Sequence, residues 1–546
     1  MTTSRIISRV IGAFACLAPF ALSAQPHDIA LRIDKIFANL DRNAPGCAVA
    51  LGKDGRALYT HAYGSANLEY GIPLTDSSVM ESGSVAKQFT AAAMVLLSQD
   101  GKLALDDDIR KYLPEVPDFG KTITIRNLLT HTSGLRDHWG LLGIEGRGPG
   151  TQVHSPHTTL DLVAHQKMLN FPPGSAYLYS NTGYALAALI IERVSGKTLQ
   201  EFTQDRLFVP LGMTHTLWRD DFTRVIPNRA TAYSMQAGTF HTDMPFTNMV
   251  GNGGILSTMA DLLKWNENFD NTTVGGATFT PTLQTQMRLT NGRTVTYALG
   301  LEHLVYDGVN EIGHGGSTAG YRTFLARYPD QHVSVAVWCN NASINPTVLA
   351  HQVADVVLVK PPHTQAASIL PAIHQTRAEL SQWAGVYRDV MTDQITTLVA
   401  NDSALTGGAT QVFIPIGPQQ FRTPTGQVQF SREGRLRTFI LARANGDTAH
   451  FEEVKLSPRT VPTADYVGRY VSDELDAVLN VIARDDSLFI TRRPDSDIAL
   501  RPTYADAFQG SGGLNSIQFN RDAKGVVTGF SIFAGRVLDV RFKRLK

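Results

Sequence analysis

The chain has 546 residues, a formal net charge of zero and a hydrophobic content of 43%, with 18% of its residues charged. At roughly 100–200 residues per domain, this length predicts two to four globular domains. The even balance of charge gives no indication of the basic surface of a nucleic-acid-binding protein or of a polybasic membrane-binding patch.

The amino-terminal segment has the three parts of a secretory signal peptide. Arg5 and Arg9 form a basic start, residues 10–22 are an apolar run, and small residues up to Ala24 precede a polar stretch. The apolar run is too short to span a membrane comfortably, and no later stretch qualifies. We therefore expect a signal peptide over residues 1–24, cleavage near Ala24, and a periplasmic or secreted protein without a transmembrane segment.

Residues 25–360 mix strand and helix patterns in a way that predicts one α/β sandwich domain. Alternating apolar residues predict hairpins near its two ends, and apolar residues at helical spacing predict helices between them. The expected hairpin strands are residues 47–51 with 57–63 and 321–327 with 333–339, and the expected helices are residues 84–99 and 182–194. Strands at both ends of the domain indicate a sheet in which early strands pair with late ones.

The tail of the chain is expected to be all-β. A linker at residues 361–375 contains Pro361 and Pro362, and short alternating segments separated by turns follow it. The tail repeats itself, because Trp-Ala-Gly-Val-Tyr at residues 383–387 matches Tyr-Val-Gly-Arg-Tyr at 466–470, and Gln-Phe at 429–430 matches Gln-Phe at 518–519. Two small antiparallel β-barrels are therefore expected, at residues 376–460 and 461–546. The alternative is two unrelated β segments that share aromatic-glycine turns.

Ser84 and Lys87 form a Ser-x-x-Lys motif at the start of the first predicted helix. A spacing of three residues places both side chains on one face of the helix, where a hydrogen bond to the lysine helps to remove the serine proton. The helix N-terminus adds free N–H groups and the positive end of its dipole. A chain of this length also contains such a motif by chance, so a surface helix start is the alternative interpretation.

Two further motifs carry groups suited to the same chemistry. In Tyr179-Ser180-Asn181, a tyrosine whose pKa is lowered by a nearby lysine can act as a general base, and the asparagine can bind an amide. In His314-Gly315-Gly316, the glycines let the backbone approach a ligand, and the N–H of Ser317 can face an oxyanion. Taken singly, the first motif is also a turn with a capping residue, and the second is also a glycine-rich turn.

Together, the three motifs have the order and approximate spacing of the penicillin-recognising serine hydrolases, which residues 28–359 resemble. Residues 128–135, 210–213 and 253–258 resemble the class C β-lactamase-like branch of that family. The resemblance implies an antiparallel sheet flanked by helices, in a β-lactamase/transpeptidase-like fold. It implies catalytic roles for Ser84 as nucleophile and for Lys87 and Tyr179 in acid/base work, and substrate-binding roles for Asn181, His314, Gly316 and Ser317. The oxyanion hole would be the backbone N–H groups of Ser84 and Ser317. The family topology would also place Cys47 and Cys339 on neighbouring strands, where a disulfide between them is possible but not required.

Two features distinguish the chain within this family. His314 stands where most β-lactamases carry a lysine, and an imidazole is a weaker anchor for a substrate carboxylate. The two lipocalin-like barrels at the carboxyl end resemble those of the bacterial D-aminopeptidases. The resemblance therefore implies an aminopeptidase that releases N-terminal (D-)amino acids through an acyl-enzyme at Ser84. The alternatives are an esterase or weak β-lactamase/DD-peptidase of the same fold, and a non-catalytic sensor of peptidoglycan or peptides.

The expected partner is a small peptide, amide or ester substrate, without nucleic acid and without a cofactor, and a homodimer is left open. A metal site is not expected, because His131, His138 and His154 lack a compact ligand spacing.

The segment at residues 492–513 in the second barrel is longer and more irregular than its counterpart in the first barrel, and it is rich in charge and proline. Such a segment is suited to a projecting loop. By resemblance to the D-aminopeptidases, we expect it to cover the mouth of the active site, with Asp495, Asp497 and Asp506 as candidate partners of a substrate ammonium group. The alternative is a mobile surface loop without a role.

Overall fold

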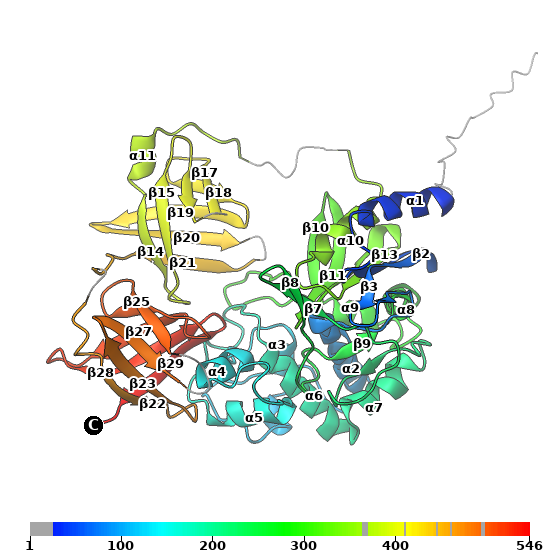
Figure 1. Ribbon diagram of the computed structural model, residues 1–546, viewed down its shortest axis with the longest axis horizontal. Helices are drawn as coiled ribbons and strands as arrows, with labels where there is room; N and C mark the ends of the chain where they lie inside the picture. Colours follow the sequence, from blue (N-terminus) through cyan, green and yellow to red (C-terminus); the bar gives the residue numbers. More distant parts are fainter. Residues whose placement is uncertain (1–25, 363–369, 409–410, 444–445, 459–460, 493–496) are drawn as a thin grey trace, which may run out of the picture.

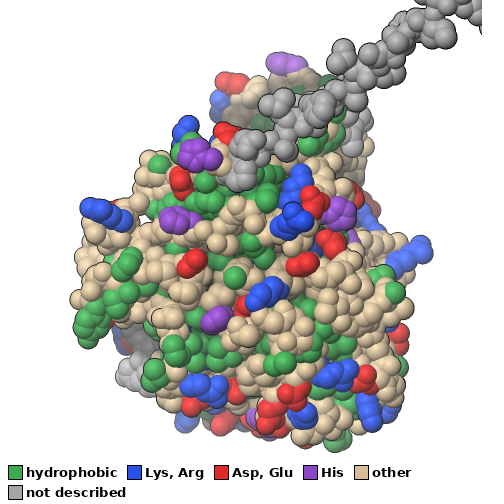
Figure 2. Space-filling view, turned by 90° about the vertical axis from the view of Figure 1, so that its right-hand side faces the viewer, with side chains coloured by type: hydrophobic (Ala, Val, Ile, Leu, Met, Phe, Trp, Pro, Cys, Tyr) green, Lys and Arg blue, Asp and Glu red, His purple; other side chains and the backbone are tan. Residues whose placement is uncertain are grey.

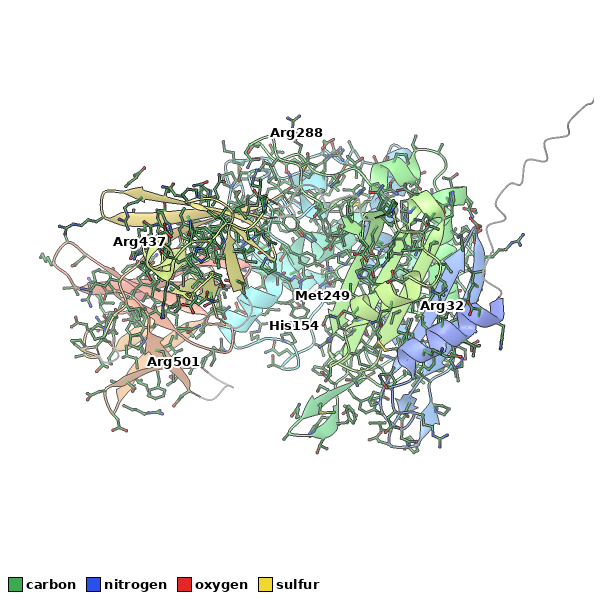
Figure 3. All side chains as sticks on the ribbon, turned by 90° about the horizontal axis from the view of Figure 1, so that it is seen from above. Arg32, His154, Met249, Arg288, Arg437 and Arg501 are labelled. Atoms are coloured by element: carbon green, nitrogen blue, oxygen red, sulfur yellow. A yellow bond between two sulfur atoms is a disulfide. The ribbon has the colours of Figure 1, made fainter. Side chains whose placement is uncertain are left out.

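The computed structural model describes residues 26–362, 370–408, 411–443, 446–458, 461–492 and 497–546, so the predicted signal peptide lies outside the described residues. Figure 1 shows an α/β domain beside two β-barrels that lie one above the other. Seen from above, Arg437 on the first barrel and Arg501 on the second lie toward one end of the molecule, and Arg32 on the α/β domain lies at the opposite end (Figure 3). The predicted fold class, an α/β sandwich followed by two antiparallel barrels, is confirmed.

The α/β domain is built on a six-stranded antiparallel sheet with the strand order β10-β11-β12-β13-β1-β2. Its strands are β1 (Cys47–Lys53), β2 (Arg56–Tyr63), β10 (Glu302–Tyr306), β11 (Val309–Thr318), β12 (Tyr321–Tyr328) and β13 (Val333–Cys339). β1 pairs with β13, so the early strands join the late strands in one sheet, as the sequence predicted. Short strands outside this sheet are β3 (Ser65–Asn67), β4 (Ile72–Pro73), β5 (Met80–Glu81), β6 (Leu217–Trp218), β7 (Tyr233–Gln236), β8 (Thr239–Thr242) and β9 (Ile255–Ser257).

Helices cover both faces of this sheet because its strands are apolar on both sides. Ala48 and Ala50 pack into the core formed with the large helical layer, whereas Val49 and Leu51 point the other way, into a core shared with α1 and α10. The helices of the domain are α1 (Pro26–Phe37), α2 (Lys87–Gln99), α3 (Ile125–Leu129), α4 (His138–Glu145), α5 (Pro156–His165), α6 (Asn181–Ser195), α7 (Leu199–Thr203), α8 (Met259–Asn271), α9 (Phe279–Leu283) and α10 (Pro346–Ala354).

The tail forms two closed barrels of eight strands each. A short helix, α11 (Arg377–Ser381), precedes the first barrel, whose strands are β14 (Gly385–Asp389), β15 (Ile395–Ala400), β16 (Leu405–Gly407), β17 (Gln411–Pro415), β18 (Gln420–Thr423), β19 (Gly426–Glu433), β20 (Leu436–Arg443) and β21 (Thr448–Glu453). The second barrel consists of β22 (Gly468–Val471), β23 (Val478–Arg484), β24 (Ser487–Thr491), β25 (Ile498–Pro502), β26 (Ala507–Gln509), β27 (Ser516–Arg521), β28 (Val527–Ala534) and β29 (Val537–Arg544).

Residues that match between the two repeats make the same contacts in the two barrels. The Tyr387 hydroxyl donates to the Trp383 carbonyl at 2.8 Å, and the Tyr470 hydroxyl donates to the Tyr466 carbonyl at 2.7 Å. In the same way, Phe430 pairs with Phe439 across β19 and β20, and Phe519 pairs with Phe530 across β27 and β28. Equivalent residues in equivalent contacts favour duplication of one barrel over two unrelated β segments.

Cys47 and Cys339 face each other on the neighbouring strands β1 and β13, with their Cα atoms 3.9 Å apart, and a disulfide joins them. The two residues are 292 positions apart in the chain, so the bond links the first strand of the sheet to the last. Both side chains are fully buried in the core beneath α1 and α10.

We expect the purified, unreduced protein to be lighter than the reduced protein by two hydrogen atoms in intact-mass spectrometry, because the disulfide replaces the two thiol hydrogens of Cys47 and Cys339. Alkylation of the unfolded, unreduced chain should therefore leave both cysteines unmodified. If both cysteines take up the alkylating reagent without prior reduction, the two strands are held together by packing and hydrogen bonds alone.

The surface of the α/β domain mixes charges of both signs. On the face shown in Figure 2, Lys and Arg side chains are interspersed with Asp and Glu side chains and no broad area of one sign is visible, as the zero net charge of the chain suggests. Across the described part of the chain, the helices are too short or too polar to cross a membrane.

Candidate active site

Ser84 and Lys87 lie where a 3₁₀ turn passes into α2. The sequence predicted one helix over residues 84–99, whereas the structure has a 3₁₀ turn at Gly83–Ala86 followed by α2 from Lys87. The Lys87 amine lies 3.1 Å from the Ser84 hydroxyl oxygen, 3.0 Å from the Asn181 side-chain oxygen and 2.7 Å from the Asn252 carbonyl. The predicted Ser-x-x-Lys pair is therefore in direct contact, and two further acceptors hold the amine in place.

The Lys87 side chain is completely buried. Burial lowers the pKa of Lys87 well below its ordinary value of 10.5, since a charged amine loses its hydration there, and nearby Asp137 opposes this effect while Arg536 adds to it. A lysine whose pKa is depressed in this way can be neutral near physiological pH. It can then accept the proton of Ser84.

Tyr179 lies over the same lysine, with the Lys87 amine 4.8 Å from the centre of its ring. Its hydroxyl is buried and has no hydrogen-bond partner among the described residues. Burial raises the pKa of Tyr179, and the Ser84 hydroxyl and Arg536 lower it by smaller amounts. The sequence suggested a tyrosine made basic by a charged lysine, but the two pKa directions favour a neutral lysine as the base and a protonated tyrosine beside it.

The ring of His131, which the sequence brought up only as one of three histidines without metal-ligand spacing, packs against the ring of Tyr179. The two ring centres are 4.0 Å apart, and the Nδ1 atom of His131 accepts a hydrogen bond from the Ser180 N–H at 3.1 Å. Burial lowers the pKa of His131, so its neutral ring packs against the tyrosine. The spacing between His131 and Tyr179 along the chain does not predict this contact.

Asn181 is the first residue of α6 and is oriented by Asp137. Its backbone N–H and its side-chain amide both donate to one Asp137 carboxylate oxygen, at 2.7 and 2.9 Å. Because the amide nitrogen is held by Asp137, the amide oxygen points to Lys87. Asn181 is thus fixed between the base and the substrate cavity.

β11 brings His314, Gly316 and Ser317 against the turn that carries Ser84. A Cβ atom on Gly316 would lie 2.0 Å from the Ser82 carbonyl oxygen, and one on Gly83 would lie 2.5 Å from the Ser317 nitrogen, so only glycine permits this approach. His314 accepts or donates one hydrogen bond of 2.9 Å with the Tyr297 hydroxyl. Burial lowers the pKa of His314 to about 3, and its imidazole is neutral at physiological pH.

These groups surround one cavity of about 940 Å³, a volume suited to a small peptide or amide. Six of the seven predicted catalytic and substrate-binding residues line this cavity, and the seventh, Lys87, is hydrogen-bonded to Ser84 in the lining. The cavity also contains two residues that the sequence analysis did not identify: Glu302 at the start of β10 and Arg536 from the second barrel. No local motif marks either residue, because only tertiary packing brings them to Ser84.

The segment at residues 492–513 is not the projecting loop that was expected, because its described part contains β25 and β26, which pair with each other in the second barrel. Arg492 donates to the Gly143 and Ile144 carbonyls, which docks the start of the segment on α4. Asp497 forms an ion pair with Arg484, and Asp506 forms one with Arg521, so both pair with arginines of the same barrel. Neither aspartate lines the cavity, and Asp495 lies outside the described residues. The expectation that Asp497 and Asp506 face the active site is therefore wrong, because each already neutralises an arginine of its own barrel.

Within the described ranges, no group of three or more His, Cys, Asp or Glu side chains is arranged to hold a metal ion. His138 and His154 are both buried, and neither of them lines the cavity. Burial lowers the pKa of each.

Comparison with known proteins finds relatives that cover most of the chain. A D-aminopeptidase of Brucella anthropi is 27% identical over 526 residues, covering 92% of this chain and 96% of that protein, and one of Brucella ovis is 27% identical over 530 residues with the same coverage. A penicillin-binding protein homologue from Pyrococcus abyssi has the same fold, with a TM-score of 0.54 and 21% identity over 86% of this chain and 98% of that one. A D-amino acid amidase from Ochrobactrum anthropi matches with a TM-score of 0.52 and 23% identity, over 60% of this chain and 98% of that one.

The family model described as Beta-lactamase matches residues 33–358, which is more than half of the chain and includes Ser84, Lys87, Tyr179 and His314. The chain therefore belongs to the beta-lactamase family.

Proposed function

We propose that this protein is an exported serine hydrolase that is acylated at Ser84 and releases N-terminal residues of D configuration from short peptides and amides. The observation that carries the hydrolase chemistry is the contact of 3.1 Å between the completely buried Lys87 amine and the Ser84 hydroxyl. The predicted signal peptide supports export to the periplasm or the medium.

The geometry supports acyl transfer in two halves. Neutral Lys87 accepts the Ser84 proton while the serine oxygen attacks the substrate carbonyl carbon, and the resulting oxyanion faces the N–H groups of Ser84 and Ser317. When the C–N bond breaks, the proton passes from the Lys87 ammonium, through or beside the Tyr179 hydroxyl, to the leaving amine. Water then adds to the acyl-enzyme by the same path in reverse, which releases the acid and restores Ser84.

The preference for a free amino terminus is supported by a carboxylate in the cavity. Glu302 lines the cavity, half-buried, and forms no ion pair with any residue that the structure describes. Burial raises the pKa of Glu302, so a cation beside it would stabilise the charged carboxylate. The other two acidic residues in the cavity lining each interact with an arginine. Glu81 forms an ion pair with Arg219, and Asp243 interacts electrostatically with Arg322. A substrate ammonium group is the cation that Glu302 can bind.

A kinetic panel tests the proposal directly. We expect turnover of D-alanine amide and D-alanine p-nitroanilide, with little turnover of their L forms, of N-acetylated forms and of nitrocefin. Short esters turned over faster than every amide would favour an esterase, and nitrocefin as the best substrate would favour a β-lactamase. Absence of labelling by a fluorophosphonate probe would instead favour a non-catalytic sensor.

Glu302→Gln should reduce kcat/KM for D-alanine amide by about tenfold to a hundredfold, because a charge-assisted hydrogen bond becomes a neutral one. The loss should appear mainly in KM. Glu192→Gln, which changes an exposed glutamate on α6, serves as the matched control and should behave like the wild type. Equal kinetics of Glu302→Gln and wild type would show that the ammonium group is bound elsewhere.

A further inference from the structure

A hairpin of the second barrel reaches into the catalytic cavity. β28 and β29 are joined by a tight turn at residues 535–536, in which Gly535 has a φ of +62°, a conformation that favours glycine. The next residue, Arg536, lines the cavity together with Ser84, Tyr179 and His314. Its guanidinium carbon lies 4.5 Å from the centre of the Tyr179 ring.

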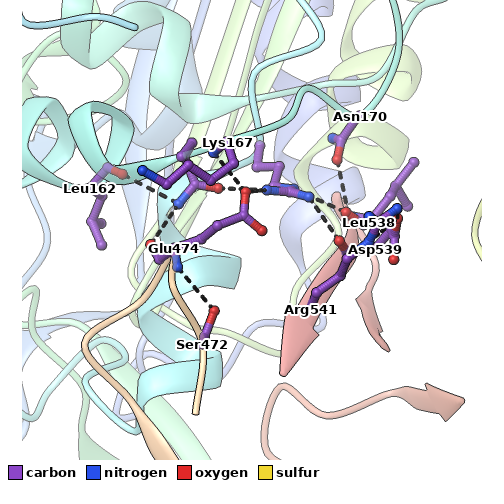
Figure 4. A network of polar contacts seen from close by, with 10 residues as sticks. Leu162, Lys167, Asn170, Ser472, Glu474, Leu538, Asp539 and Arg541 are labelled. Carbon is purple, nitrogen blue, oxygen red and sulfur yellow. Dashed lines mark hydrogen bonds and ion pairs between the residues drawn. The ribbon is translucent and has the colours of Figure 1, made fainter. Parts of the chain in front are cut away.

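The backbone of this hairpin is fixed to the α/β domain by a buried polar network (Figure 4). Arg136 donates to the Leu538 and Asp539 carbonyls, both at 2.9 Å, and forms an ion pair of 2.7 Å with Glu474 of the same barrel. Both charged side chains of that pair are almost completely buried. Such a pair is costly to break, so the hairpin keeps a defined position beside the active site.

Two further bonds fix the turn itself. Asn170 donates from its side-chain amide to the Arg536 carbonyl at 2.9 Å and accepts from the Leu538 N–H at 2.9 Å. These bonds use only the backbone of the hairpin. The position of the turn is therefore set without the Arg536 side chain, which leaves the guanidinium available to a ligand.

The Arg536 guanidinium has no anionic partner among the residues that the structure describes: it donates no hydrogen bond and forms no ion pair there. Among the described residues, the other basic groups at the cavity either are paired or have a pKa that burial lowers. Burial keeps His314 neutral and lowers the pKa of Lys87, and Arg219 is paired with Glu81. Arg536 is therefore the exposed cation that faces this cavity.

We propose that Arg536 binds the carboxylate of the substrate, so that the enzyme prefers short peptides with a free carboxyl terminus over the same peptides as amides. This inference rests on the proposed function and adds a second charged contact to it. Glu302 would hold the ammonium group and Arg536 the carboxylate, which together select a zwitterionic short peptide. Arginine suits this role because its planar guanidinium forms two parallel hydrogen bonds to a carboxylate.

The test compares D-Ala-D-Ala with D-Ala-D-Ala amide, which share the scissile bond and differ only in the terminal carboxylate. We expect wild-type kcat/KM to be about tenfold to a hundredfold higher for the free acid, since a hydrogen bond to a charged group contributes about this much. R536Q should bring the ratio of the two values close to one, mainly through KM for the acid, and R536K should retain part of the preference. Arg536 also lowers the pKa values of Lys87 and Tyr179, but this effect changes both substrates alike and cancels in the ratio.

R501Q is the matched control, because Arg501 is an exposed arginine of the same barrel outside the cavity lining. It should keep the wild-type ratio, and thermal melting should show that R536Q and R536K remain folded. A wild-type ratio near one, or a wild-type ratio in folded R536Q, would overturn the inference. Turnover of D-alanine amide without turnover of either dipeptide would also overturn it while leaving the proposed function in place, whereas a protein that hydrolyses none of the three would contradict both.

Discussion

Ser84→Ala is expected to lower kcat for D-alanine amide by about a thousandfold or more, because the variant lacks the hydroxyl oxygen that would form the acyl-enzyme. The fold should survive the change. Lys87 retains its bonds to Asn181 and Asn252 when the serine oxygen is removed, and a small polar residue at a helix start contributes on the order of 1 kcal/mol to stability.

Fluorophosphonate labelling followed by intact-mass spectrometry provides the second measurement for this variant. The wild type should gain one phosphonyl group, and Ser84→Ala should gain none. Ser98→Ala, at the other end of α2, is the matched control and should label and turn over as the wild type does. Activity of Ser84→Ala within tenfold of the wild type would refute the nucleophile assignment.

Lys87→Ala and Tyr179→Phe should each lower the acylation rate by at least about a hundredfold, because each removes one group from a single proton path. The double variant should lose much less than the product of the two single losses, since groups that act as a unit do not contribute independently. Single-turnover measurement with D-alanine p-nitroanilide gives the acylation rate directly. Losses that multiply would show that the two groups serve separate proton transfers.

The pH dependence separates the two residues further. Burial lowers the pKa of Lys87, and only the neutral amine can accept a proton, so wild-type kcat/KM should fall as the pH drops through that pKa. This limb should disappear in Lys87→Ala and persist in Tyr179→Phe, because the pKa of Tyr179 is raised and its hydroxyl stays protonated over the same range. The exposed Lys102→Ala should keep the wild-type profile. A limb that persists in Lys87→Ala would assign it to another group.

Local sequence was sufficient for two hairpins of the main sheet, for the two barrels and for the main catalytic motif. The positions of Ser84 and Lys87 three residues apart predicted their contact, because side chains at that spacing share one face of a helical turn. Alternating apolar residues located the β1–β2 and β12–β13 hairpins, and the repeated aromatic-glycine segments located two barrels, since a strand alternates its faces whatever it packs against.

The charged contacts at the substrate cavity were decided by tertiary structure. The sequence led us to expect a projecting loop rich in charge and proline at residues 492–513, because this composition disfavours strand structure. Pairing within the barrel instead forms β25 and β26 there, and local composition does not say where the segment docks. Arg492 binds carbonyl groups of α4, whereas the short turn at Arg536, unremarkable in the sequence, reaches Tyr179. That turn is positioned by bonds from Arg136 and Asn170, more than 300 residues earlier in the chain. A sequence motif identifies groups that are close because few residues separate them along the chain. Arg536 is close to Tyr179 because the second barrel packs against the α/β domain, and the hydrogen bonds of Arg136 and Asn170 fix that packing.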